Sequence, residues 1–267
     1  MPKGLFVKKL VFACLIVVCS LSSCGESAGQ SESELDIAVW LYVISAEAGD
    51  TAASFRLGLM YALGEDVAQD FEEAMKWFRM SAEQGNADAQ FFLGLGYATG
   101  QGVIQHFEEA VKWFRMSAEQ GNADAQYNLG NVYANGQGVI PDFEEAMKWF
   151  RMSAEQGNAD AQFNIGWMYN NGENVIQDFE EAVKWFRMSA EQGNADAQFN
   201  IGLSYATGQG VILDLVLAHM WFDIAALKDD MVAAGNRERI STIMTPQQIA
   251  EAQQVARECL GRNLQNG

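Results

Sequence analysis

The sequence predicts an all-α fold, a right-handed α-solenoid of stacked antiparallel helix pairs, because two patterns recur along it every 36 residues. The segment SAEQGNADAQ occurs four times, and a weaker copy, SAEAGDTAAS, lies one period earlier. A Trp-Phe pair recurs at the same interval. The segments begin at Ser45, Ser81, Ser117, Ser153 and Ser189, and the pairs begin at Trp77, Trp113, Trp149, Trp185 and Trp221. A fixed period of this length is typical of solenoids, in which each unit buries its apolar face against its neighbours.

The first half of each unit has the pattern of an amphipathic helix. Asn86 is a favourable N-cap, and Ala89, Leu93 and Tyr97 follow at four-residue intervals on one helical face. Gly94 lies beside that apolar stripe, where the missing side chain would let a neighbouring backbone come close. We therefore expect a helix that begins after Asn86 and ends at the glycine-rich turn near residue 100.

The second half of each unit predicts a helix with an acidic start. Glu73 follows Asp70 at the spacing of a capping box, and Asp142 and Asp178 begin the same pattern in later units. His106 takes the place of the aspartate in one unit. The paired glutamates of these first turns are explained by capping and by the helix dipole, so they do not indicate glycosidase chemistry.

Three more predictions concern side chains of the second helices. Glu72 and Lys76 have the spacing and order of a favourable ion pair on a solvated face. Both histidines of the chain, His106 and His219, are expected to be exposed. Methionines that recur with the period are expected to be buried in the core. They are Met80, Met116, Met152 and Met188.

The turn between the two helices of a unit has one position that holds only Gly, Asn or Asp. These are the residues that best tolerate a positive φ angle, so we expect a left-handed residue there in every unit. The position is occupied by Asp66, Gly102, Gly138, Asn174 and Gly210.

One complete unit displays the whole consensus. The residues that carry it are Gly121, Asn122, Ala123, Ala125, Leu129, Gly130, Tyr133, Gly136, Gly138, Val139, Asp142, Ala146, Trp149 and Ala154. This pattern resembles the Sel-one-like repeat, a helical-repeat family related to the tetratricopeptide repeats. The resemblance implies stacked helix pairs and a role in binding other proteins.

The repeat pattern divides the chain into five parts. Five units are predicted over residues 45–224, preceded by an incomplete helix at residues 35–44. Capping helices are expected over residues 225–267, since an open solenoid needs a polar end. The small and acidic segment 24–34 has the composition of a flexible tether, and residues 1–23 have that of a signal peptide.

The N-terminal segment has a basic start followed by an apolar run of 12 residues, 10–21. A membrane-spanning helix needs about 20 residues, so the run indicates a secretory signal. The sequence Leu21-Ser22-Ser23-Cys24 resembles the lipobox of bacterial lipoproteins. The alternatives are a plain signal peptide with a chance cysteine and an uncleaved anchor.

The lipobox resemblance implies cleavage before Cys24 and attachment of a diacylglyceryl group to its sulfur. Three acyl chains, as the resemblance implies, would give a stable anchor. Residue 25 is Gly and not Asp, which by the sorting rule of enterobacterial lipoproteins implies the outer membrane. We therefore expect a lipid-anchored protein on the periplasmic face of the outer membrane of the bacterial cell envelope.

The composition excludes several functional classes. The chain of 267 residues has 17 basic and 35 acidic residues, a net charge of −18, so a nucleic acid partner is not expected. With two histidines far apart, little remains for a metal site, and we expect neither a metal nor a cofactor. Once the signal is removed and Cys24 is lipidated, Cys259 remains alone, so no internal disulfide is expected. It lies on the apolar stripe of the last helix and should face the body.

The units differ mainly at three positions of their first helices. The first position holds Arg56, Phe92, Asn128, Asn164 and Asn200, the second holds Leu59, Leu95, Asn131, Trp167 and Leu203, and the third holds Leu63, Thr99, Asn135, Asn171 and Thr207. The second and third positions are four residues apart and share one helical face. In the related tetratricopeptide solenoids this face lines the concave side. The mixture of Trp, Leu, Asn and Arg suits protein recognition, and Trp167 is expected to be the main contact. The alternatives are that residues at these positions vary because they pack against nothing, or that Trp167 folds into a groove between units.

The sequence favours a non-catalytic, monomeric scaffold that binds a protein or peptide on the concave face, and no enzyme. Stacked helices offer area and no closed pocket, and no nucleophile, base and metal ligands cluster in the sequence. The first alternative is a β-lactam-binding or hydrolysing enzyme, like cysteine-rich relatives in the family, although the repeats here contain no cysteine. The second alternative is a purely structural spacer.

Overall fold

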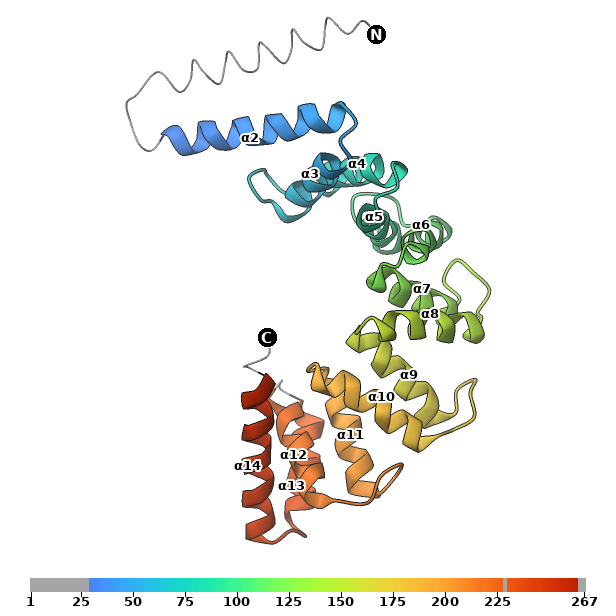
Figure 1. The fold of residues 1–267 in the computed structure, drawn as a ribbon, viewed down its shortest axis with the longest axis vertical. Coiled ribbons are helices and arrows are strands. Elements are labelled where there is room, and N and C mark those ends of the chain that lie inside the picture. The colour runs from blue at the N-terminus through green and yellow to red at the C-terminus, as the bar shows by residue number, and fades with distance from the viewer. Residues whose placement is uncertain (1–28, 228–229, 264–267) are drawn as a thin grey trace, which may run out of the picture.

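The computed structural model describes residues 29–227 and 230–263, and its elements there are thirteen α-helices with no strand (Figure 1). Their bounds are α2 Gly29–Glu47, α3 Thr51–Leu63, α4 Phe71–Glu83, α5 Ala87–Thr99, α6 Phe107–Glu119, α7 Ala123–Asn135, α8 Phe143–Glu155, α9 Ala159–Asn171, α10 Phe179–Glu191, α11 Ala195–Thr207, α12 Leu215–Ala226, α13 Met231–Ser241 and α14 Pro246–Asn263. The predicted all-α solenoid is confirmed. The predicted signal peptide and Cys24 lie outside the described residues.

The helices pack in the order in which the chain makes them. Each first helix, from α3 to α11, contacts the second helix of its own unit and the second helix of the unit before it. Figure 1 shows the units following one another along a curved path, from α2 at one end to α14 at the other. Each unit therefore depends on its neighbours for burial, as expected of a solenoid.

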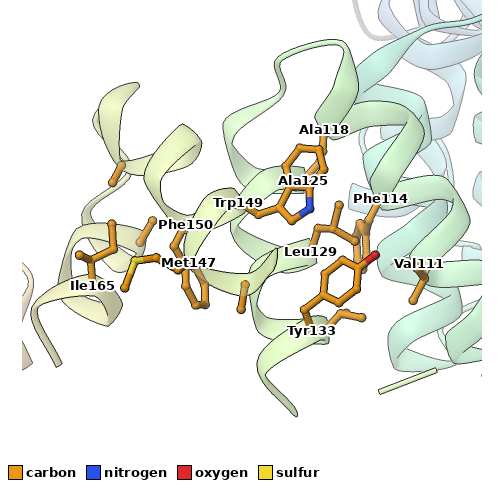
Figure 2. Packing of buried hydrophobic residues seen from close by; sticks show 14 of the residues in the cluster. Val111, Phe114, Ala118, Ala125, Leu129, Tyr133, Met147, Trp149, Phe150 and Ile165 are labelled. Carbon is orange, nitrogen blue, oxygen red and sulfur yellow. The ribbon is translucent and has the colours of Figure 1, made fainter. Parts of the chain in front are cut away.

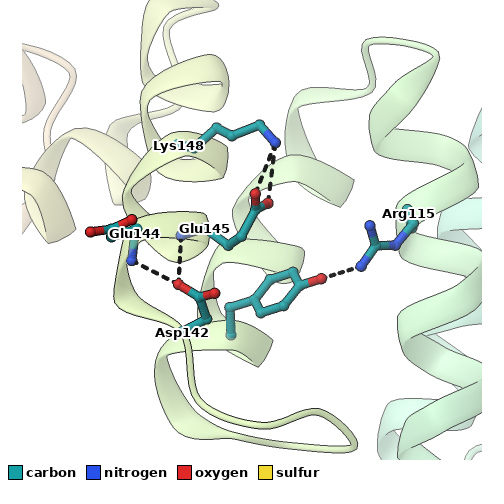
Figure 3. A network of polar contacts seen from close by, with 6 residues as sticks. Arg115, Asp142, Glu144, Glu145 and Lys148 are labelled. Atoms are coloured by element: carbon teal, nitrogen blue, oxygen red, sulfur yellow. Dashed lines mark hydrogen bonds and ion pairs between the residues drawn. The ribbon is translucent and has the colours of Figure 1, made fainter.

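The caps of the second helices form as predicted, but the capping box does not close. Asp142 Oδ1 accepts the backbone N–H groups of Glu144 and Glu145, both at 3.1 Å (Figure 3). Glu145 does not bond back to the cap. Instead its carboxylate pairs with Lys148 at 3.1 Å, while the backbone N–H of Asp142 donates to the carbonyl of Tyr133 on the preceding helix. The hydrogen bond from Asp142 to Tyr133 thus replaces the bond to the Glu145 side chain that would close the capping box.

The ion pair of the first repeat is shifted by one residue from its prediction. Lys76 Nζ lies 2.6 Å from Glu73 Oε2, so the pair has i,i+3 spacing and Glu72 is not its partner. His106 caps its helix as expected, since its Nδ1 accepts the N–H of Glu109 at 3.3 Å.

The turn within each unit has the left-handed residue that the sequence predicts. Asp66 and Asn174 are the non-glycine residues with positive φ in the described chain, at 62° and 59°. Gly102 has a φ of 70°, and a Cβ added to it would lie 2.1 Å from the carbonyl oxygen of Phe71. Glycine is therefore needed at residue 102 for space as well as for its backbone angle.

Aromatic rings fill the space between the helices of a unit. Figure 2 shows Phe114, Leu129 and Phe150 as members of one buried cluster in the middle of the chain. A Cβ added to Gly94 would lie 2.7 Å from Cδ1 of Phe114. The expectation for Gly94 was therefore wrong in its detail, because the glycine makes room for a ring and not for a backbone.

Buried polar side chains join each unit to the next. Ser117 Oγ donates to the carbonyl of Ala87 at 2.7 Å, and Gln156 Nε2 donates to Gln126 Oε1 at 2.7 Å. Arg115 also donates to the hydroxyl of Tyr133 on the following helix (Figure 3). Because the groups that these bonds join are paired, the bonds fix the register of the stack at little cost in desolvation.

Two predictions of burial were wrong. The periodic methionines, expected in the core, lie on the surface of the second helices and are 38–44% exposed. His219, expected to be exposed, is buried, with 3% of its surface accessible. It stands where equivalent positions hold Met147 and Val183, which are buried too. The repeat frame, and not the polarity of histidine, decides its place.

The two ends of the solenoid differ from their sequence predictions in extent. Helix α2 begins at Gly29, so the last six residues of the expected tether 24–34 are helical, and the incomplete helix 35–44 is part of this longer element. Residues 29–34 contain no proline, which leaves the helix free to extend. At the other end, α13 and α14 cover the last repeat, with Ala252 buried beside Phe222. Cys259 is a free thiol that packs against the core of the last repeat, as predicted.

Candidate interaction surface

The predicted binding positions lie on the five first helices, α3, α5, α7, α9 and α11. The structure divides them into two groups that differ in burial and in contacts. The first group, on α3 and α5, comprises Arg56, Leu59, Phe92 and Leu95. The second group, on α7, α9 and α11, comprises Asn128, Asn131, Asn135, Asn164, Trp167, Asn171, Asn200 and Leu203.

The first group is largely occupied by packing within the protein. The ring of Phe92 stacks on Phe78 with centroids 5.1 Å apart and planes 10° apart. Leu59 packs against the same cluster, and Leu95 packs against the next. Arg56 is exposed. Three of these four side chains therefore stabilise the contact between repeats and leave little surface to a partner.

The second group forms a row of amides. Asn164 Nδ2 donates to Asn131 Oδ1 at 3.3 Å and so connects α9 with α7. Asn135 Nδ2 donates to the carbonyl of Asn131 at 2.9 Å, and Asn200 Nδ2 donates to that of Asp196 at 2.7 Å. Each carboxamide carries two N–H donors and one oxygen acceptor. One internal bond therefore leaves hydrogen-bonding capacity for a peptide backbone.

Trp167 is the largest exposed side chain in this row. Its side chain is 43% exposed, and its ring contacts Phe163 with centroids 6.3 Å apart. Asn164 and Asn171 lie one helical turn away on either side, and Leu203 occupies the equivalent place on α11 with 38% exposure. The indole is therefore held on one side by Phe163 and open on the other, and it is not enclosed in a groove between units.

A second row of exposed side chains was not recognised in the sequence. Each of four turns between a first and a second helix carries an isoleucine that is 87–91% exposed. These residues are Ile104, Ile140, Ile176 and Ile212. The sequence signal is a recurring Val-Ile pair, in which the valine belongs to the repeat consensus and the isoleucine does not. Exposure at the isoleucine depends on how the turn folds away from the stack.

No compact ionisable centre occurs in the described residues. No three of their His, Cys, Asp or Glu side chains converge as metal ligands would. Burial lowers the pKa of the His219 imidazole below its usual value, an effect that the nearby Asp223 carboxylate opposes. Its Nδ1 has no hydrogen-bond partner in this part of the chain, and Asp223 itself pairs with Arg237 at 2.6 Å. His219 therefore belongs to the packing of α12.

One open hollow of the surface, of about 280 Å³, lies between α4 and the turn that follows α5. It is lined by Glu72, Met75, Lys76, Arg79, Gly102 and Val103. Its two basic residues already have partners, since Lys76 pairs with Glu73 and Arg79 donates to the hydroxyl of Tyr97. Among the helices described, none combines the length and the apolar character that crossing a bilayer requires.

Comparison with known proteins identifies the repeat. The family model described as Sel1 repeat matches five segments, each of which starts where a first helix starts. The segments are residues 51–86, 87–122, 123–158, 159–194 and 195–230. The period of 36 residues agrees with the sequence analysis, while the frame begins six residues later than the predicted units.

Two solved structures share the fold with substantial sequence identity. One is a protective antigen present in uropathogenic Escherichia coli strains that displays an SLR fold, with 32% identity and a TM-score of 0.77 over 85% of this chain. The other is a Sel1 repeat protein from Oxalobacter formigenes, with 35% identity and a TM-score of 0.71 over 77% of this chain. The alignments span 49% and 59% of the lengths of those proteins. A search among curated proteins found no match.

Proposed function

Because this chain belongs to the Sel1 repeat family, we propose that it is a non-catalytic scaffold that binds a protein or peptide through the amide row of α7, α9 and α11. The exposed indole of Trp167 is the observation that carries the proposal. Tryptophan is enriched among the residues that dominate binding energy, above all where its surroundings can exclude water. The proposal places the partner on the concave side of the solenoid.

The chemistry of the row favours an extended peptide segment. Carboxamides such as those of Asn131 and Asn171 can donate to and accept from the peptide groups of a partner backbone, whatever its sequence. Trp167 and Leu203 add apolar contact area for one or two side chains. The partner is therefore a polypeptide with an apolar residue between backbone groups that are free to hydrogen-bond.

A crosslinking experiment in intact cells tests this proposal. A photoreactive amino acid replaces Asn171, beside Trp167, and in a matched control replaces Met188, which is exposed at 44% on the second helix α10. We expect a protein adduct from position 171 that is lost when Trp167→Ala is added, and no such adduct from position 188. Equal adducts from both positions, or an adduct that survives Trp167→Ala, would contradict the proposal.

We further propose that the protein is tethered to the bacterial cell envelope through a lipid on Cys24, facing the periplasm from the outer membrane. The lipobox-like sequence that ends at Cys24 supports this. Metabolic labelling with an alkyne fatty acid should mark the wild-type protein and not Cys24→Ser. A label that persists in Cys24→Ser would contradict lipidation at this residue, and fractionation of the two membranes tests the location.

The enzymatic and spacer alternatives predict different measurements. A β-lactam hydrolase would show turnover that disappears with substitutions on the repeat surface, whereas the scaffold is expected to show none. A spacer or oligomer module would change mass with concentration in light scattering, whereas we expect a monomer. The repeats contain no cysteine, which distinguishes this chain from the cysteine-rich relatives that motivate the enzymatic alternative.

A further inference from the structure

Four isoleucines at the turns contribute almost nothing to the folded core. Ile104, Ile140, Ile176 and Ile212 are each 87–91% exposed, so they contact little of their own chain. A single exposed aliphatic residue needs no explanation. Four at the same place in successive repeats make a regular series of apolar points, which is typical of an interaction surface.

The fold does not require isoleucine at this place. In the first repeat the equivalent residue is Ala68, and the turn around it keeps the same hydrogen bond, from Gln69 Nε2 to the carbonyl of Ala62 at 2.8 Å. The second repeat has this bond from Gln105 to Ala98, also at 2.8 Å. The turn therefore forms equally with alanine, and the isoleucine side chain is free for another use.

The valine before the isoleucine is the same in all four turns, whereas the residue after it and the residue two before it vary. The next residue is Gln105, Pro141, Gln177 or Leu213, and the position two residues before holds glycine or asparagine. The isoleucine itself is unchanged in all four turns. In Figure 1 the turns that join α7 to α8, α9 to α10 and α11 to α12 project on the outer side of the curve.

Carboxylates accompany the isoleucines. Glu108, Glu144 and Glu180 each follow an isoleucine by four residues and are exposed in the first turn of a second helix. Glu144 and Glu180 make no ion pair within the described chain, because the lysine of each helix pairs with the next glutamate instead. Apolar points and negative charges thus alternate along one edge.

We propose that these turns form a docking edge for a basic amphipathic polypeptide of another protein, whose apolar residues cover the isoleucines and whose Lys or Arg side chains meet the glutamates. The edge consists of Ile104, Ile140, Ile176, Ile212, Glu108, Glu144 and Glu180. A second copy of this chain, with its net charge of −18, would be repelled. Anionic lipid headgroups would be repelled for the same reason.

The surface beside the edge can receive a side chain. The open hollow of about 280 Å³ adjoins the turn of Ile104, with Val103 and Met75 in its wall. An aliphatic residue of the partner that enters there contacts the turn of one repeat and the second helix of the repeat before it. The docking edge is distinct from the amide row, so this inference stands independently of the proposed function.

Peptide binding to the full chain tests the docking edge. The probe is a labelled peptide of about 15 residues made of Lys and Leu, with all leucines on one helical face. Two matched probes replace Lys by Glu, or Leu by Ser, at every position. Fluorescence anisotropy should show that the Lys-Leu probe binds at least about tenfold more tightly than either, and that high salt weakens it.

Variants of the protein separate the two components of the edge. The fourfold variant I104S/I140S/I176S/I212S and the threefold variant E108Q/E144Q/E180Q should each weaken binding of the Lys-Leu probe by about tenfold or more. Ala68→Ser, at the turn without isoleucine, is the matched control and should bind like the wild type. Trp167→Ala should also leave this binding unchanged, which separates the docking edge from the amide row. Circular dichroism confirms that the variants are folded.

Three results would overturn the inference. The first is wild-type affinity in both multiple variants, and the second is equal binding of the Glu-Leu probe. The third is that the Lys-Leu probe does not bind and that the isoleucines instead contact a membrane or a second copy of the chain. Membrane contact would appear as flotation on phosphatidylethanolamine–phosphatidylglycerol vesicles, measured with Cys24→Ala in the wild-type and fourfold-variant backgrounds. Self-association would appear in sedimentation velocity, and either effect would be lost in the fourfold variant.

Discussion

Helices α5 and α9 occupy the same place in two repeats and yet present different surfaces. On α5 the variable positions hold Phe92 and Leu95, which are packed against rings and aliphatic side chains of neighbouring helices. On α9 the same positions hold Asn164 and Trp167, which form an amide bridge and an open indole. Both helices have the same place in the repeat, so the difference between their surfaces comes from the side chains at these variable positions. The proposed recognition surface is therefore local to part of the solenoid.

The sharpest test of this contrast removes one aromatic ring from each helix. Phe92→Ala should lower the free energy of unfolding by about 2–3 kcal/mol, because the stacked contact with Phe78 is lost. Trp167→Ala should cost about 1 kcal/mol or less, since much of its ring is already exposed. Urea unfolding followed by circular dichroism measures both. Equal losses would mean that α9 is packed like α5.

The turns that follow these two helices extend the comparison to the backbone. Gly102→Asn should destabilise by about 1–3 kcal/mol, since its Cβ would meet the carbonyl of Phe71. Asn174→Gly, the reverse change at the equivalent place, should shift stability by less than about 1 kcal/mol, because glycine accepts the φ of 59° without strain. Thermal unfolding of both variants checks the order. A larger effect at Asn174 would contradict the difference in space.

The amide bridge gives a smaller effect that can be isolated with a double-mutant cycle. Asn131→Ala and Asn164→Ala should each cost about 0.5–1.5 kcal/mol, and the pair should lose less than the sum because they share one hydrogen bond. Strict additivity would mean that the 3.3 Å contact between Asn164 and Asn131 contributes nothing to stability. No such coupling is expected between Phe92 and Asn164.

The smallest effect concerns pH and the end of the solenoid. Burial lowers the pKa of His219 in the folded protein, so the unfolded chain binds the proton more readily and folding loses stability as pH falls below the usual histidine pKa. His219→Met, which restores the residue of equivalent positions, should reduce this loss between pH 7 and pH 5. Melting temperatures of both proteins over that range measure it. Parallel curves would show that His219 titrates normally.

The architecture could be predicted from the sequence in nearly all its parts. Asn86 and Asp142 form the caps that their residue types indicate, and Asp66 and Asn174 have the positive φ expected of the turn. These features depend on a few neighbouring residues, and the 36-residue period repeats each of them. Local preferences and period agree at every unit, which makes the prediction robust.

Predictions about individual side chains were less successful, because they depend on neighbours that are distant in sequence. Glu73 pairs with Lys76 because a carbonyl of the preceding helix takes the N–H that a capping box would use. Phe92, a predicted binding residue, stacks on Phe78 and is half-buried, a contact that its position in the repeat did not indicate. Helical period identifies a face, but it does not say how deeply the next repeat covers that face.

The sequence by itself determined that this chain is a stack of helix pairs, where the helices of the repeats start and end, and that its net charge is strongly negative. Only the tertiary structure decided which repeated side chains are covered: His219 is buried, whereas the periodic methionines and the isoleucines of the turns are exposed. The reason is that caps and turns are local interactions, whereas exposure depends on the angle at which one repeat packs on the next.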